Sequence, residues 1–181
     1  TVEGSAVFSG AVYAENISVG VAADMANDGG SNLIKGDFNS TVNATTINVI
    51  GGTGNAAEDA ILEIAGTTTA TTLNVTGGTT HDDADAVARL TGATVAVTTI
   101  NLQETAANKT ATVQFNGGAA QAVASNIDGV GAAEGTVEGI AGANAVTFAV
   151  TVGDSADDGI RVLNVGSGSA RGVAVFYGAV D

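Results

Sequence analysis

The chain has 181 residues, 45% of them hydrophobic, which is enough apolar material for a folded core and argues against disorder. Nineteen acidic residues against five lysines and arginines give a net charge of −14, so nucleic acids and anionic membranes, which both select basic surfaces, are not expected partners. The absence of cysteine excludes disulfides, thiolate nucleophiles and cysteine-bound zinc.

The core has to be built from small and β-branched side chains. The chain has five phenylalanines, two tyrosines, no tryptophan and no proline, together with 26 glycines. Leu, Glu, Lys and Gln, the usual residues of helix surfaces, are sparse. This composition predicts an all-β fold of thin, stacked sheets. No apolar run is long enough to cross a membrane, so membrane insertion is not expected.

The first 31 residues predict two short strands, Ala6–Tyr13 and Ile17–Val21, followed by a loop that contains Asp24 and Asp28. The most regular part of the chain comes next. The segment Thr45–Val49 recurs at residues 71–75 and again at 98–102, at intervals of 26 and 27 residues. In an extended chain its apolar residues lie on one face and its Asn on the other. Stacked copies then predict an apolar column and an amide ladder, formed by Ile47, Leu73 and Ile100 and by Asn48, Asn74 and Asn101.

The whole chain can be divided into units of this kind. Further strands are expected at Leu33–Ile34, Thr46–Ile50, Ala60–Ile64, Thr72–Val75, Ala86–Leu90, Val95–Leu102, Ala111–Phe115, Ala120–Ile127, Val146–Val152, Ile160–Val165 and Gly172–Val180. Within one unit we expect Ala60–Ile64 to pair with Thr72–Val75. Units of 22–31 residues predict a parallel β-helix, a solenoid of about seven coils that forms a single domain over residues 1–181.

An alternative fold is a pair of tandem antiparallel β-sandwich domains with a boundary near residues 86–95. Such domains also consist of short alternating strands joined by glycine-rich turns. The absence of proline, the recurrence at 26 residues and the lack of a large aromatic core residue favour the solenoid.

The two ends of the chain resemble one another. Gly4–Val12 matches Gly172–Val180 at seven of nine positions, so the last strand resembles the first strand of a further copy. Apolar residues such as Phe8 and Phe176 stand where a polar cap is expected, and a solenoid without caps has open strand edges. The sequence therefore predicts a slice of a longer array or two ends that join, with copies of the same chain as partners.

Acidic loops recur between the expected strands. Carboxylates that share one edge of a stack repel one another unless a cation lies between them, and calcium accepts such flexible oxygen ligands. The ligands expected for calcium are Asp82, Asp83, Asp85, Asp154, Asp157 and Asp158. No segment has EF-hand spacing, and loop aspartates also form ordinary turns. His81, the only histidine, is expected to be an exposed loop residue and not a zinc ligand.

No constellation of catalytic residues is apparent. Some β-helix enzymes cleave acidic polysaccharides with calcium-bound carboxylates and an arginine base, but nothing in the sequence groups Arg89, Arg161 or Arg171 with carboxylates, so we expect no enzymatic activity. Five Asn-x-Ser/Thr glycosylation acceptors are present, and in a chain so rich in Asn and Thr most are expected to be coincidental: Asn16, Asn39, Asn43, Asn74 and Asn108.

In its Ala/Gly/Thr/Val/Asp usage, its Thr-Thr-Ile-Asn-Val strands and its Gly-x-Ala-Val-Phe-x-Gly-Ala-Val strands, the chain resembles the β-strand-repeat regions of microbial surface proteins. Surface-layer proteins, autotransporter passengers and large adhesins contain such regions. The resemblance implies an extracellular or cell-surface structural role, often assisted by calcium. We therefore expect a subunit of a surface layer, filament or matrix that self-assembles end to end. The alternatives are an adhesin module that binds glycan or a host surface and a polysaccharide-cleaving enzyme.

Overall fold

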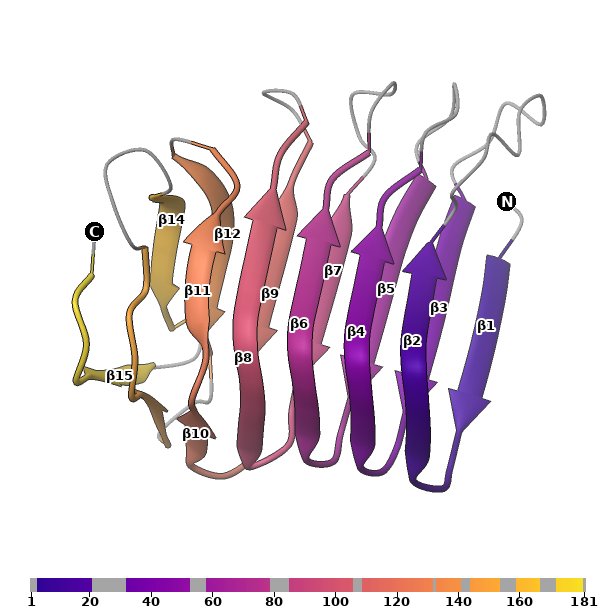
Figure 1. The fold of residues 1–181 in the computed structure, drawn as a ribbon, viewed down its shortest axis with the longest axis horizontal. Helices are drawn as coiled ribbons and strands as arrows, with labels where there is room; N and C mark the ends of the chain where they lie inside the picture. Colours follow the sequence, from indigo (N-terminus) through magenta and orange to yellow (C-terminus); the bar gives the residue numbers. More distant parts are fainter. Residues whose placement is uncertain are drawn as a thin grey trace.

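The structure is a computed structural model that describes residues 3–20, 32–52, 58–78, 85–105, 109–131, 133–140, 144–153, 159–166 and 172–180. All regular elements in these ranges are β-strands, and the strands pair in parallel. The described part contains no helix that could cross a membrane. Figure 1 shows the strands stacked side by side along one axis, with the two termini at opposite ends of the stack.

The strands form two sheets that face each other across the core. The seven-stranded sheet contains, in spatial order, β1 (Glu3–Phe8), β3 (Asn32–Phe38), β5 (Glu58–Ile64), β7 (Ala86–Leu90), β9 (Ala111–Phe115), β12 (Glu134–Gly139) and β14 (Ile160–Val165). The eight-stranded sheet contains β2 (Val12–Gly20), β4 (Val42–Ile50), β6 (Thr68–Thr76), β8 (Thr94–Gln103), β10 (Gln121–Val123), β13 (Ala145–Phe148) and β15 (Val173–Phe176), and β11 (Asn126–Gly129) also pairs with β8.

The chain passes from one sheet to the other in every coil, which makes a β-solenoid of about five turns. The predicted all-β fold of stacked parallel coils is confirmed, and the antiparallel sandwich alternative is wrong. Both sheets continue without interruption through β7 and β8, which contain the alternative boundary near residues 86–95. Regularity is lost toward the C-terminal end, where β10, β11, β13 and β15 are only three or four residues long.

The predicted apolar column is present. Ile47 pairs with Leu73, and Leu73 pairs with Ile100, all three fully buried between the sheets. The column continues beyond these strands in both directions, to Ile17 on one side and to Ile127, Val152 and Val180 on the other. One position of the repeat therefore forms an apolar contact that extends from the first coil to the last.

A recurrent irregularity explains why the strands of the eight-stranded sheet are longer than predicted. In β4 the side chains of Ala44 and Ile47 both point into the core, and both threonines between them face outward. Pairing with β6 passes from Ala44–Ala70 to Thr46–Thr72 and skips Thr45 and Thr71 together, so the same irregularity recurs at one place in consecutive coils. At this point the alternation of inward and outward side chains shifts by one residue. The first half of each strand therefore does not continue the apolar–polar alternation that predicted the second half.

Close backbone contacts between coils shape the corners that lead from the seven-stranded to the eight-stranded sheet. A Cβ atom on Gly92 would lie 1.9 Å from the carbonyl oxygen of Gly66 in the preceding coil, so only glycine fits there. The corner amides continue the ladder of the sheet: the N–H groups of Ala65 and Thr91 donate to the carbonyls of Phe38 and Ile64 at 2.8 and 2.9 Å. The corners thus stack as tightly as the strands.

A buried glutamine closes the longer corner between β9 and β10. Gln121 is 2% exposed, and its side-chain oxygen accepts a hydrogen bond from the N–H of Gly117 at 2.8 Å. Its amide nitrogen donates to the carbonyls of Leu90 and Gly92 at 2.9 and 2.8 Å. These bonds give the buried amide side chain its partners and tie it to the backbone of two neighbouring coils.

Three strand predictions are wrong in detail. Ala6–Tyr13 includes a corner and contributes to two strands, because Phe8 ends β1 and Val12 begins β2. Ala60–Ile64 does not pair with Thr72–Val75, since the two segments lie in opposite sheets. Ala120–Ile127 is divided between β10 and β11. In each case the alternation of apolar residues continues across a change of direction that it does not signal.

The buried column predicts a large effect of truncation. Replacement Leu73→Ala is expected to lower the free energy of unfolding by about 3 kcal/mol, because it removes a fully buried side chain from the middle of the column. Denaturant unfolding followed by circular dichroism measures the change. The control Thr71→Ala, at an exposed position of the same strand, is expected to cost less than about 0.5 kcal/mol. Equal losses for the two variants would contradict the assignment of the column.

Candidate assembly surfaces at the two ends of the stack

The N-terminal end of the stack is open. Strands β1 and β2 are the outermost members of the two sheets, and each pairs with a neighbour on one side only. Between them lies a cavity of about 350 Å³ whose lining includes Ala6, Phe8, Val12 and Ile17. The N–H and C=O groups along these two free edges can pair with a further strand.

The first two coils have small side chains at one of the column positions that line this cavity. Ala6 and Gly36 occupy the column position that Leu62 fills in β5. A Cβ atom on Gly36 would lie 2.7 Å from Cγ2 of Val19, so glycine also lets the two sheets approach closely at this end. The only signal of this cavity in the sequence is a pair of small residues, Ala6 and Gly36, at a repeat position that is Leu62 in the third coil.

In the described part of the chain the C-terminal end is open as well, and apolar side chains lie at its edge. Strands β14 and β15 are the outermost members here. Leu163 and Phe176 pack against the core but are only partly buried, and Val165 and Val180 are 46% and 45% exposed. This end therefore exposes apolar side chains in place of a cavity.

The two phenylalanine segments that resemble each other in sequence form the same local contact in different sheets. Phe8 of β1 stacks on Phe38 with ring centroids 4.7 Å apart, and Phe176 of β15 stacks on Phe148 at 4.9 Å. However, β1 belongs to the seven-stranded sheet and β15 to the eight-stranded sheet. The prediction that the last strand is the equivalent of the first strand of a further copy is therefore wrong. The shared sequence encodes a short strand that ends on a stacked phenylalanine.

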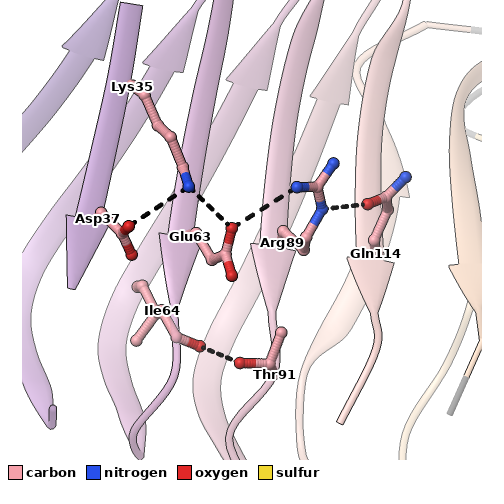
Figure 2. Close-up of polar contacts among 7 residues, drawn as sticks. All are labelled: Lys35, Asp37, Glu63, Ile64, Arg89, Thr91 and Gln114. Atoms are coloured by element: carbon pink, nitrogen blue, oxygen red, sulfur yellow. Dashed lines mark hydrogen bonds and ion pairs between the residues drawn. The ribbon is translucent and has the colours of Figure 1, made fainter. Parts of the chain in front are cut away.

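A row of polar side chains runs along the outer face of the seven-stranded sheet, and Figure 2 shows its first part. Lys35 lies 3.3 Å from Asp37 and 3.2 Å from Glu63, and Arg89 lies 3.6 Å from Glu63. The Nε atom of Arg89 donates to Oε1 of Gln114 at 2.7 Å. The row continues to β14 through two more bonds, from Gln114 to Glu138 at 2.8 Å and from Asn164 to Glu138 at 3.2 Å.

The outer face of the eight-stranded sheet is polar but uncharged in its regular part. Strands β4, β6 and β8 contain no Asp, Glu, Lys or Arg. The predicted amide ladder is present: Asn74 donates to Asn48 and accepts from Asn101, both at 2.9 Å. The other outward residues of these strands are mostly threonines, so in a chain of net charge −14 this face is a flat surface of hydroxyls and amides.

Two of the three arginines considered as bases of a polysaccharide-cleaving enzyme are described, and they lie in different strands, β7 and β14. Arg89 belongs to the polar row. Arg161 forms a two-pronged pair with Glu104, at 2.8 and 2.6 Å, which ties β14 to the end of β8. This pairing raises the pKa of Arg161. Arg171 lies outside the described residues. Neither described arginine contacts one of the acidic loops, and the absence of enzymatic activity stays a prediction.

Only one residue of the predicted calcium site is described. Asp85 accepts a hydrogen bond from the N–H of Thr110 at 3.0 Å, and its own N–H donates to Asp59 at 3.1 Å, so the aspartates link consecutive coils at this corner. The described residues contain no group of three side chains able to hold a metal ion. The other predicted ligands lie outside the described ranges: Asp82, Asp83, Asp154, Asp157 and Asp158. His81, which is predicted to be an exposed loop residue, lies outside them as well.

Comparisons with protein-family models, with curated proteins and with solved structures find no match to this chain. Function therefore has to be inferred from the surfaces described above.

The polar row predicts a pH-dependent contribution to stability. Hydrogen bonds to Glu63 and Asp37 raise the pKa of Lys35 above its ordinary 10.5. Because the folded pKa is the higher one, the contribution of Lys35 is complete below pH 10.5 and is lost as the pH rises through the folded pKa. The difference in unfolding free energy between wild type and Lys35→Met should thus stay constant from about pH 7 to pH 9 and shrink above pH 10.5.

The control for this prediction is Arg89→Met. Arg89 contacts the same carboxylate through a guanidinium group, a type of group that keeps its charge at these pH values, so the difference between Arg89→Met and wild type should not shrink in the same range. Urea unfolding at each pH measures both differences. Equal behaviour of the two variants would show that Lys35 does not titrate as its contacts imply.

Proposed function

We propose that this protein is a non-enzymatic structural subunit of an extracellular surface layer, filament or matrix, and that copies of it assemble end to end. The proposal is supported above all by one observation: among the described residues, both ends of the stack leave the outer edges of both sheets without a neighbouring strand and expose apolar side chains there. An exposed strand edge beside apolar side chains is a site for pairing with another chain. We also propose that the units at both ends are full coils, which brings the stack to about seven.

Charge is expected to govern the conditions of assembly. Copies with a net charge of −14 repel one another, and the repulsion falls as salt screens it. We propose that calcium assists at the acidic loops, with Asp82, Asp83, Asp85, Asp154, Asp157 and Asp158 as ligands.

Assembly should therefore be stronger with calcium than with the same ionic strength of sodium chloride. Replacing the six aspartates by asparagine should remove that difference.

A second candidate function is an adhesin module that binds glycan or a host surface. The uncharged face formed by β4, β6 and β8 favours it, because hydroxyls and amides can exchange hydrogen bonds with sugar hydroxyls over a flat area. Tyr13, which is 74% exposed on the neighbouring β2, offers an aromatic ring beside this face. Binding of the isolated chain on a glycan array would favour this candidate over assembly alone.

Assembly through the ends predicts that one charge at the N-terminal edge is enough to prevent it. Ala6 faces the cavity between β1 and β2, so Ala6→Glu places a carboxylate against apolar groups of a joined copy. Ser5→Glu is the matched control, because Ser5 lies on the same strand and faces the opposite side. Light scattering and negative-stain electron microscopy should show assemblies for wild type and Ser5→Glu and single particles for Ala6→Glu. A wild-type chain that stays monomeric at high concentration, with calcium and without it, would contradict the proposal.

A further inference from the structure

The two ends differ in a way that selects one mode of joining. All strand pairs within the stack are parallel. Two copies that met through the same end, related by a two-fold axis, would instead place their edge strands antiparallel. Parallel pairing at the joint requires unlike ends, with β14 beside β1 and β15 beside β2 of the next copy. This inference rests on the proposed function and specifies its geometry.

The side chains of the two ends are complementary when the register of the stack is continued. The column that begins with Ala6 ends with Leu163, and the column that begins with Phe8 ends with Val165. On the other sheet the columns that begin with Val12 and Ile17 end with Phe176 and Val180. Those four first residues line the cavity, and those four last residues are the partly exposed apolar side chains of the opposite end.

We propose that the N-terminal cavity is a socket for the C-terminal end of a second copy, joined head to tail so that both sheets continue across the joint. Leu163 lies against Ala6 and enters the cavity beside it. Val165 covers Phe8, and Phe176 and Val180 contact Val12 and Ile17. Two N-terminal ends could not fill each other, because both are hollow.

The corner ladder continues in the same register. At each tight corner, the residue that follows the strand donates its N–H to the carbonyl of the last strand residue in the preceding coil. The first of these hydrogen bonds runs from Asn39 to Phe8 and the last from Gly166 to Gly139, both at 2.9 Å. One more step along the stack pairs the N–H of Ser9 with the carbonyl of Val165 in the preceding copy. The joint thus repeats a hydrogen bond that the fold already makes at every coil.

Engineered cysteines test the joint directly, since the chain has no cysteine of its own. On the outer face of the seven-stranded sheet one row begins with Val7 and ends with Asn164. Within one copy these residues lie at opposite ends of the stack, whereas in the proposed joint they are neighbours about 4.8 Å apart, within the range of a disulfide. The full chain carrying Val7→Cys and Asn164→Cys should give a reducible ladder of multimers after mild oxidation.

Two controls define the register and the polarity. Val162 belongs to the neighbouring outward row, so Val7→Cys with Val162→Cys is two residues out of register and should not cross-link. Val7→Cys alone should also stay uncross-linked. Efficient dimers of this single variant would show that like ends meet and would overturn the head-to-tail joint.

The outcomes separate this inference from the proposed function. Assemblies seen by microscopy without cross-linking of the in-register pair, or with cross-linking of the out-of-register pair, would refute the joint while leaving end-to-end assembly in place. Monomers under all conditions would refute both. Cross-linked multimers of the in-register pair alone would establish the register, the polarity and the partner together.

Discussion

Parallel pairing in register between consecutive coils is the constraint on which the rest of this structure depends. It places each residue of one coil beside the equivalent residue of the next, with no freedom to shift by one position without turning core side chains outward. Ile47, Leu73 and Ile100 meet in the core for this reason, and Asn48, Asn74 and Asn101 meet on the surface for the same reason. A repeat of similar residues is therefore both the cause and the product of the fold.

The same constraint has different consequences inside and outside the stack. Inside, stacked positions have to share the available volume, and the small residues Ala6 and Gly36 line a cavity. Outside, like charges would be stacked at the spacing of neighbouring strands, where repulsion is strong. The seven-stranded sheet stacks Asp37 directly beside Glu63 and offsets the two negative charges with Lys35, which contacts both carboxylates, and with Arg89, which contacts Glu63. The eight-stranded sheet has no charged residue in its regular strands β4, β6 and β8, whose outer face is mostly threonine and asparagine.

Nothing in the geometry of a single coil prevents a further coil from pairing with it. Every coil presents the next one with a free edge and a matching set of columns, and the last coil presents them to whatever follows. The described ends show no polar cap, and in two columns the C-terminal end has a larger side chain than the N-terminal end, with Leu163 against Ala6 and Phe176 against Val12. This complementarity is more specific than the exposure of apolar groups alone, and it connects the geometry of a single coil with a structural role for the protein.

The sequence by itself determined which residues are equivalent. The interval of 26 and 27 residues and the alternation within each copy predicted the apolar column, the amide ladder and the stacked parallel coils, because both patterns depend only on local geometry. Only the tertiary structure decided where the chain turns and which sheet each strand joins. Corners depend on contacts such as that of Gly92 with the preceding coil, and the two phenylalanine segments fold alike but lie in different sheets. The end cavity also needed the structure, since a gap between side chains depends on which positions face each other across the core.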